Sequence, residues 1–152
     1  MLSKNVTAIL LGYSGHGIVV SEAAALSNIQ ILGYTSLEEV NINPYSFDFL
    51  GDENNSDFNW ENCKSYILGV GSNTIRKTMA LRVEKAGGKC LSIVHPNCSL
   101  ASTISIGEGT FVARNVAINP LVQVGKNAIL NTSCTIDHEC IIGDNVHIAP
   151  GA

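Results

Sequence analysis

A histidine between two acidic residues, Asp137-His138-Glu139, is the pattern in this sequence best suited to proton transfer. Imidazole titrates near neutral pH, so a neutral ring can accept a proton from a reacting nucleophile. Asp137 or Glu139 could orient the ring and stabilise the imidazolium that forms. The triplet taken alone is more often an exposed histidine with solvated neighbours, so the interpretation depends on where the fold places it.

Two glycine-containing turns form a second group of candidates. The segment Gly12-Tyr13-Ser14-Gly15-His16-Gly17 follows an aliphatic run and precedes a helical stretch, and Gly71-Ser72-Asn73 follows another predicted strand. Glycines in such turns let backbone N–H groups approach a phosphate at a helix N-terminus. Because parallel strands end at one edge of their sheet, we expect the two turns to share a ligand; the alternative is two unrelated tight turns. The spacing GxxGxG differs from the dinucleotide pattern GxGxxG and disfavours dinucleotide-dependent redox chemistry.

The first half of the chain alternates strands and helices, which indicates a parallel sheet with right-handed crossovers. We expect strands at residues 6–11, 29–34, 65–70 and 89–94, helices at 18–26 and 74–86, and an irregular loop over 41–62 with a short strand near 47–50.

The second half repeats every six residues. An aliphatic residue occupies every sixth position, and all but Ile104 of the residues four places later are small or compact. The aliphatic positions are Val94, Leu100, Ile106, Val112, Ile118, Val124, Leu130, Ile136, Ile142 and Ile148. Neither a helix nor a strand has this period, but a triangular coil with three six-residue sides does. With Ile136 pointing inward, His138 is expected to face outward at a corner, one coil above Asn119.

Composition excludes several classes of protein. The 152 residues are 45% hydrophobic and 14% charged, which is typical of a packed globular protein. A net charge of −4 offers no basic patch for nucleic acid, and no apolar run approaches the length of a membrane span. The start of the chain lacks a signal-peptide pattern, so we expect a cytoplasmic protein. Five cysteines without a CxxC pair argue against a disulfide framework or a metal site and favour buried thiols.

Several segments resemble the PglD/NeuD-type sugar acetyltransferases of the hexapeptide-repeat superfamily. The similar segments are the GxSGHG turn at 12–17, Phe49-Leu50-Gly51, residues 68–73 with Arg76, Val94-His95-Pro96, and the coil from Asn131 to Pro150. The resemblance implies a Rossmann-like sugar-nucleotide-binding domain over residues 1–92, followed by a left-handed β-helix acetyltransferase domain over 93–152. It also implies a homotrimer with acetyl-CoA bound between adjacent β-helices. Since members continue for several more coils beyond Ala152, we expect this sequence to be C-terminally truncated.

The resemblance also implies roles for individual residues. His138 would be the general base, Glu139 its partner, and His147 a residue of the acetyl-CoA cleft. The sugar-nucleotide-binding residues would be Gly12, Ser14, Gly15, His16, Gly17, Gly71, Ser72 and Asn73. Members usually carry aspartates after the second strand, where this chain has Thr35 and Ser36, so the preference for base and sugar stays open.

The leading hypothesis is an acetyl-CoA-dependent N-acetyltransferase of a nucleotide-activated amino sugar in glycan or lipopolysaccharide biosynthesis. One alternative is O-acetylation of a sugar hydroxyl, as on sialic acid. Another is a trimeric module that binds a sugar nucleotide without catalysis.

Overall fold

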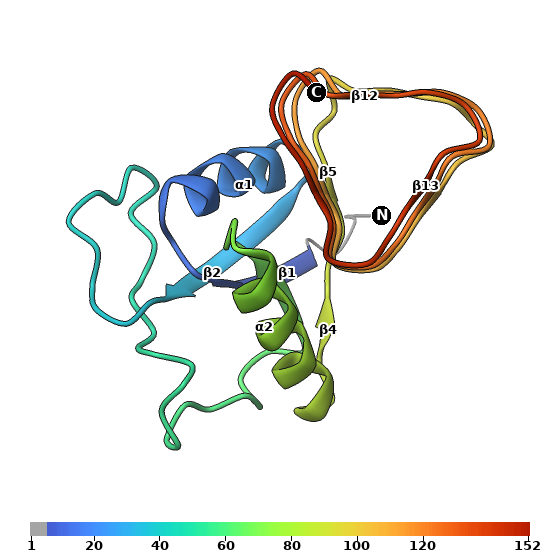
Figure 1. Cartoon of the computed structure of the whole chain (residues 1–152). Helices are drawn as coiled ribbons and strands as arrows, with labels where there is room; N and C mark the ends of the chain where they lie inside the picture. Colours follow the sequence, from blue (N-terminus) through green and yellow to red (C-terminus); the bar gives the residue numbers. More distant parts are fainter. Residues whose placement is uncertain (1–5) are drawn as a thin grey trace, which may run out of the picture.

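The computed structural model describes residues 6–152, which form an α/β part followed by a stack of three-sided coils (Figure 1). The α/β part contains β1 (Val6–Leu11), α1 (Gly15–Leu26), β2 (Ile29–Thr35), β3 (Ser65–Leu68), α2 (Asn73–Lys85) and β4 (Lys89–Cys90). Its four strands are parallel in the order β2-β1-β3-β4.

The two helices cover opposite faces of this sheet, because alternate residues of a strand point to opposite sides. Ala8 and Leu10 of β1 pack in one core cluster with the buried face of α1. Ile9 and Leu11 pack in a second cluster with α2 residues such as Met79. The aliphatic run of β1 therefore serves two cores, as expected for a strand covered on both faces.

The expected strands and helices are present, with several differences. The first helix begins at Gly15, so residues 15–17 belong to α1 and not to the turn before it, and β3 ends at Leu68. Residues 47–50 contribute only a single bridge, between Phe49 and Tyr34. The predicted strand 89–94 is divided: β4 closes the α/β sheet, whereas β5 (Ile93–Val94) pairs with the coils. The chain changes sheets at Leu91 and Ser92, where the hydrophobic pattern alone shows no break.

The second part is a parallel β-helix of two-residue strands. They are β5 (Ile93–Val94), β6 (Ser99–Leu100), β7 (Ser105–Ile106), β8 (Phe111–Val112), β9 (Ala117–Ile118), β10 (Gln123–Val124), β11 (Ile129–Leu130), β12 (Thr135–Ile136), β13 (Ile141–Ile142) and β14 (His147–Ile148). Strands that are 18 residues apart pair in three sheets, in the orders β13-β10-β7, β14-β11-β8-β5 and β12-β9-β6. The aliphatic residues of the repeat lie inside, and those of the middle coils, such as Val112 and Leu130, are fully buried.

A left-handed backbone conformation recurs at the corners of the coil. A residue with φ between 53° and 74° occurs every sixth position from Gly109 to Gly151. Glycine and asparagine adopt this conformation at little cost, but the set also contains Leu121, Ser133 and Glu139. The corners therefore follow a fixed backbone geometry whether or not the residue favours it.

One side of the coil faces the α/β part. The sheet that contains β5 lies toward α1, and the corner between β12 and β13 points away (Figure 1). Ser27 at the end of α1 donates a hydrogen bond of 3.0 Å to the Val94 carbonyl, and Phe111 shares a core cluster with α1 residues. Neither helix in the described residues is long and apolar enough to cross a membrane.

Candidate functional site

The residues predicted to transfer protons lie at the outer corner of the coil, in the turn that joins β12 to β13. His138 Nδ1 lies 2.8 Å from Glu139 Oε2, and the two side chains are 64% and 68% exposed. The repeat places Ile136 inside and His138 outside, as its spacing predicts. Because Glu139 engages Nδ1, the Nε2 atom of the ring faces outward and can exchange a proton with a bound molecule.

The two carboxylates beside His138 have different contacts. Asp137 Oδ1 accepts hydrogen bonds from Asn119 Nδ2, at 2.9 Å, and from the His138 amide, at 2.8 Å. These two bonds and the nearby imidazole lower the pKa of Asp137. Asp137 thus fixes the backbone of the corner, while Glu139 contacts the ring.

Glu139 reaches the ring because of the corner's backbone. Its φ is 60°, in the left-handed region, and its amide donates to the Pro120 carbonyl of the preceding coil at 3.1 Å. A glutamate rarely adopts this conformation. Because every corner from Gly109 to Gly151 has this conformation, the φ of Glu139 follows from the repeat, and it is the contact with His138 that makes this corner a candidate site.

A pair of histidines, His16 and His147, lies on the opposite side of the coil. His147 in β14 has Nε2 2.9 Å from Asn131 Nδ2, and its ring centroid lies 6.4 Å from that of His16 in α1. His16 also packs edge-on against Phe111, and its Nε2 atom is buried without a hydrogen-bond partner among the described residues. Burial, followed by the nearby His147 and Arg76, lowers the pKa of His16 to about 4, so the ring is neutral at physiological pH.

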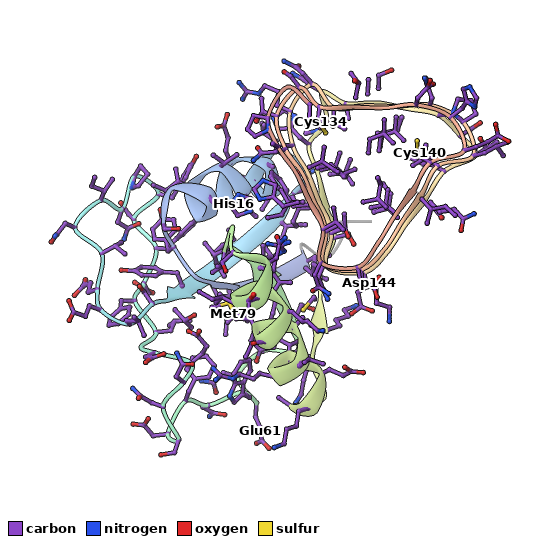
Figure 2. The ribbon with its side chains drawn as sticks, viewed as in Figure 1. His16, Glu61, Met79, Cys134, Cys140 and Asp144 are labelled. Atoms are coloured by element: carbon purple, nitrogen blue, oxygen red, sulfur yellow. The ribbon has the colours of Figure 1, made fainter. Side chains whose placement is uncertain are left out.

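These two groups are far apart within one chain. His16 lies in α1, whereas Cys140, the residue after Glu139, marks the outer corner of the coil (Figure 2). The sequence identifies both groups as candidates, and the fold places them on different sides of the coil.

The glycines of the first turn allow close packing. A Cβ atom on Gly17 would lie 2.7 Å from the carbonyl oxygen of Gly12, so α1 can start against the turn only with glycine there. Gly12 itself has a φ of 85°. The Ser14 side chain makes no capping hydrogen bond at the N-terminus of α1, so it does not satisfy the first N–H groups of this helix.

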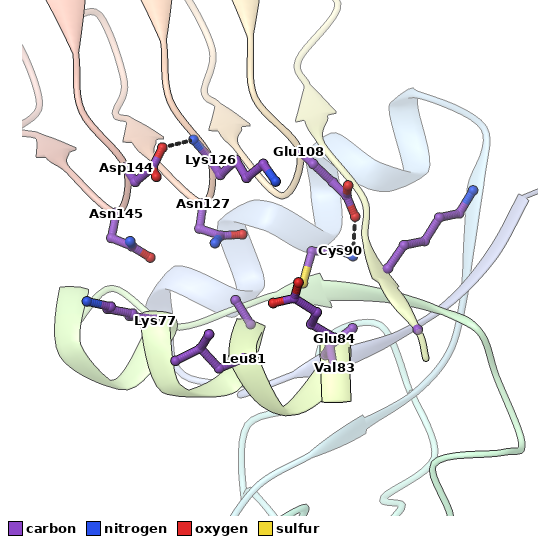
Figure 3. Close-up of a pocket in the computed structure, with 13 residues that line it drawn as sticks. Lys77, Leu81, Val83, Glu84, Cys90, Glu108, Lys126, Asn127, Asp144 and Asn145 are labelled. Carbon is purple, nitrogen blue, oxygen red and sulfur yellow. Dashed lines mark hydrogen bonds between the residues drawn. The ribbon is translucent and has the colours of Figure 1, made fainter. Parts of the chain in front are cut away.

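A cavity of about 420 Å³ lies between α2 and one corner of the coil (Figure 3). Two of its backbone amides are engaged: the Lys126 amide donates to Asp144 at 2.7 Å, and the Cys90 amide donates to Glu108 at 3.2 Å. Burial raises the pKa of the Cys90 thiol to about 12, so it is not a nucleophile. None of the predicted site residues lines this cavity.

A larger cavity, of about 620 Å³, opens at the carboxyl edge of the α/β sheet. Gly12 and Ser14 line it from the first turn, and Val70 lines it beside the second. The other predicted sugar-nucleotide residues, which do not line it, are Gly15, His16, Gly17, Gly71, Ser72 and Asn73. The first turn thus lines the cavity directly, whereas the second turn contributes only the residues on either side of it, Val70 and Thr74. A ligand shared by the two turns stays a prediction.

Arg76 contributes in a way that the sequence did not indicate. The residue is 1% exposed, and its guanidinium donates to the carbonyls of Asn127 and Asn145 in the coil, at 2.7 and 2.8 Å. It also donates to Asn73 Oδ1 at 2.9 Å, so the Asn73 side chain is engaged within the protein. Spacing gave no signal for this role, because Arg76 and Asn145 are 69 residues apart.

Comparisons with known proteins agree with this architecture. A curated relative, the GDP-perosamine N-acetyltransferase of Escherichia coli O157:H7, is 28% identical over 89 residues. That match covers 59% of this chain and 40% of the relative, so the chain matches less than half of the relative's length.

Solved structures match nearly the whole chain. The acetyltransferase domain of PglB from Neisseria gonorrhoeae FA1090 superposes with a TM-score of 0.84 at 25% identity, covering 97% of this chain and 72% of that one. PerB from Caulobacter crescentus, in complex with CoA and GDP-perosamine, has a TM-score of 0.84 at 22% identity, covering 99% and 71%. The family model of the PglD N-terminal domain matches residues 7–83, and the chain belongs to this family.

Proposed function

We propose that the chain is an acetyl-CoA-dependent N-acetyltransferase acting on a nucleotide-activated amino sugar in glycan or lipopolysaccharide biosynthesis. The observation that carries the proposal is the Glu139–His138 pair, which leaves Nε2 of an exposed imidazole facing outward. The names of the relatives support the class of reaction, since they include an N-acetyltransferase of GDP-perosamine and a structure with CoA and GDP-perosamine.

In the proposed reaction, the amine of the sugar attacks the carbonyl carbon of the acetyl thioester. The new C–N bond forms, the C–S bond breaks, and CoA leaves as the thiolate. His138 Nε2 takes the proton that the amine loses and can return it to the sulfur, while Glu139 stabilises the charged ring. The products are an N-acetyl sugar nucleotide and CoA thiol, so atoms and charge balance.

The proposal assigns the two ligands to the two parts of the chain. The cavity at the carboxyl edge of the α/β sheet would bind the sugar nucleotide, with its diphosphate near Gly12 and Ser14 at the start of α1. This assignment includes the Rossmann-like character of residues 1–92 and the left-handed course of the coil over 93–152; residues 1–5 lie outside the described structure. No metal is needed, since the imidazole and the thioester supply the chemistry.

We further propose that the active unit is a homotrimer. One chain separates His138 from His16 and His147, so a site that contains all three needs a second copy. Packing the outer corner of one coil against its neighbour would form an acetyl-CoA cleft to which His147 contributes.

The test is acetyl transfer to a nucleotide-linked amino sugar, followed by release of the CoA thiol. We expect His138→Asn to lower the rate at least hundredfold, because a general base contributes about 10²–10⁴-fold. Ser133→Asn, at a different exposed corner of the same coil, serves as the matched control and should retain the rate. Equal rates for wild type and His138→Asn would remove His138 from the proposed role.

The product and the ligands distinguish the alternatives. A product that survives mild alkali is an amide, whereas a labile product is an ester and indicates transfer to a hydroxyl. Binding of the sugar nucleotide without any affinity for acetyl-CoA would indicate a non-catalytic module.

A further inference from the structure

One carboxylate lies in the wall of the large cavity at the sheet edge. Glu53 is 5% exposed, and it is the only acidic residue among those that line this cavity, within residues 6–152. Much of the remaining wall is apolar, with Leu37 and Val40 from the segment after β2 and Ile75 and Met79 from α2. The cavity therefore combines an apolar wall with one acidic group, the usual character of a small-molecule pocket.

Backbone pairing fixes the position of Glu53. The segment before it runs alongside the end of β2, where the Leu50 amide donates to the Tyr34 carbonyl at 2.9 Å and the Ser36 amide donates to the Gly51 carbonyl at 3.1 Å. These bonds bring residue 53 to the carboxyl edge of the sheet. Glu53 is thus placed by the fold and not by a free loop.

The residues beside Glu53 are also fixed. The Asn54 amide donates to Asp52 Oδ1 at 2.8 Å, which closes a local turn. Arg82 of α2 donates from Nη1 to Asn54 Oδ1 and lines the same cavity. A carboxylate and a guanidinium therefore stand in one pocket, with the amide of Asn54 beside them.

Glu53 makes no hydrogen bond or ion pair with another side chain in the part of the chain that the structure describes. Its oxygens are open to the cavity, so a ligand bound there can donate hydrogen bonds to them. A carboxylate accepts two parallel hydrogen bonds, so it selects a ligand with two adjacent donors.

Among the common nucleobases, guanine has two such donors, N1–H and the 2-amino group, beside the acceptor O6. Uracil has one N–H between two carbonyl oxygens, which a carboxylate repels. Adenine and cytosine have a ring nitrogen acceptor beside their amino group. A carboxylate next to a guanidinium therefore matches guanine and disfavours the other three bases.

We infer that Glu53 is a specificity-determining residue that reads the guanine of a guanosine-diphosphate-linked substrate. The base lies between the apolar walls, Glu53 accepts from N1–H and the 2-amino group, and Arg82 can donate to O6. This inference rests on the proposed function, because it names the nucleotide of that substrate.

Calorimetric binding of GDP, inosine diphosphate and UDP to the full chain tests the inference. Inosine diphosphate keeps N1–H and O6 but lacks the 2-amino group. We expect affinity to fall in the order GDP, inosine diphosphate, UDP, with GDP at least tenfold above UDP, because a bidentate contact to a base is worth roughly five- to hundredfold. Glu53→Gln should weaken the binding of GDP by about tenfold or more and bring the ratio of the GDP affinity to the UDP affinity close to one.

Glu61→Gln is the matched control. Glu61 is exposed, belongs to the same irregular segment and does not line the cavity of Glu53, so this variant should keep the wild-type order of affinities. The wild-type ligand series decides the question even if Glu53→Gln fails to fold.

Three results would overturn the inference while leaving the proposed function intact. They are equal affinity for the three nucleotides, tighter binding of UDP than of GDP, and an unchanged GDP-to-UDP ratio in Glu53→Gln. Binding of none of the three nucleotides would instead contradict the assignment of this cavity to a sugar nucleotide, which is a failure of the proposed function itself.

Discussion

Residues 93–152 and residues 6–90 position their polar side chains in different ways. In the coil, every corner repeats one backbone geometry, so the direction of His138 follows from its place two residues after Ile136. In the α/β part, Glu53 and Arg76 are placed by pairing and packing with residues far away in the sequence. In a periodic element, the position of a residue within the repeat determines where its side chain lies. At the edge of a sheet, the site is formed by residues from separate segments of the chain.

The largest expected effect is a loss of stability when a buried residue of the coil is truncated. Leu130 is fully buried in the middle of the coil stack. We expect Leu130→Ala to lower the free energy of unfolding by about 4 kcal/mol, because the side chain is lost and neighbouring coils cannot close the cavity. Hydrogen exchange should accelerate in the coils above and below, while the amides of β1 and β3 stay protected.

Leu100→Ala is the control for that prediction, because Leu100 is only half-buried at the first coil. It should lower the free energy of unfolding by about 2 kcal/mol, which is less than the effect of Leu130→Ala. If both variants lost protection equally across β1, β3 and the coils, the two parts would unfold as one unit and the comparison would fail.

The next effect is a loss of stability when the contact between α2 and the coil is removed. We expect Arg76→Met to lower the free energy of unfolding by about 3 kcal/mol, since the carbonyls of Asn127 and Asn145 would lose their buried donor. Scanning calorimetry should resolve two transitions in the variant. Lys85→Met, at an exposed position of the same helix, should leave the transition unchanged.

A smaller effect is expected on the pH dependence of stability. Because the pKa of His16 is lowered to about 4 in the folded protein, against an ordinary value near 6.5, the unfolded chain binds a proton first as the pH falls. The stability gained from the neutral buried ring is complete above pH 6.5 and is lost between pH 6.5 and 4, by about 2–3 kcal/mol.

Urea unfolding at pH 7 and pH 4.5 measures this dependence. His16→Gln should reduce the difference in the free energy of unfolding between the two pH values. An unchanged difference in His16→Gln would show that the buried ring is not the group responsible.

The smallest effect concerns a corner of the coil. Glu139→Asn should raise the free energy of unfolding by up to about 1 kcal/mol, because asparagine accepts the left-handed conformation more readily than glutamate. Acetyl transfer should fall at the same time, since His138 would lose the carboxylate at Nδ1.

Leu121→Asn is the matched variant, with a φ of 65° at the same corner one coil earlier. It should gain stability and keep activity. If Glu139→Asn kept full activity as well, Glu139 would be a corner residue without a part in the reaction.

Prediction from the sequence was most complete for residues 93–152, where the six-residue period is regular. The six-residue repeat gave the coil, its inward residues and the outward corner of His138, because each coil is built on the one before it. The strand predicted over 89–94 was divided between two sheets, since an aliphatic pattern cannot tell which sheet a short strand joins. The sequence did not identify Glu53 as a site residue, because it lies in an irregular segment without a hydrophobic period.

The sequence by itself determined the order of the two architectures and the identity of His138 and Glu139 as neighbours, because local spacing fixes both. Only the tertiary structure decided that His16 becomes buried beside His147, that Arg76 joins helix to coil, and that Glu53 lines the cavity with Arg82. These outcomes depend on contacts between segments tens of residues apart. Such contacts are set by how the sheet, the helices and the coil pack, which no local pattern records.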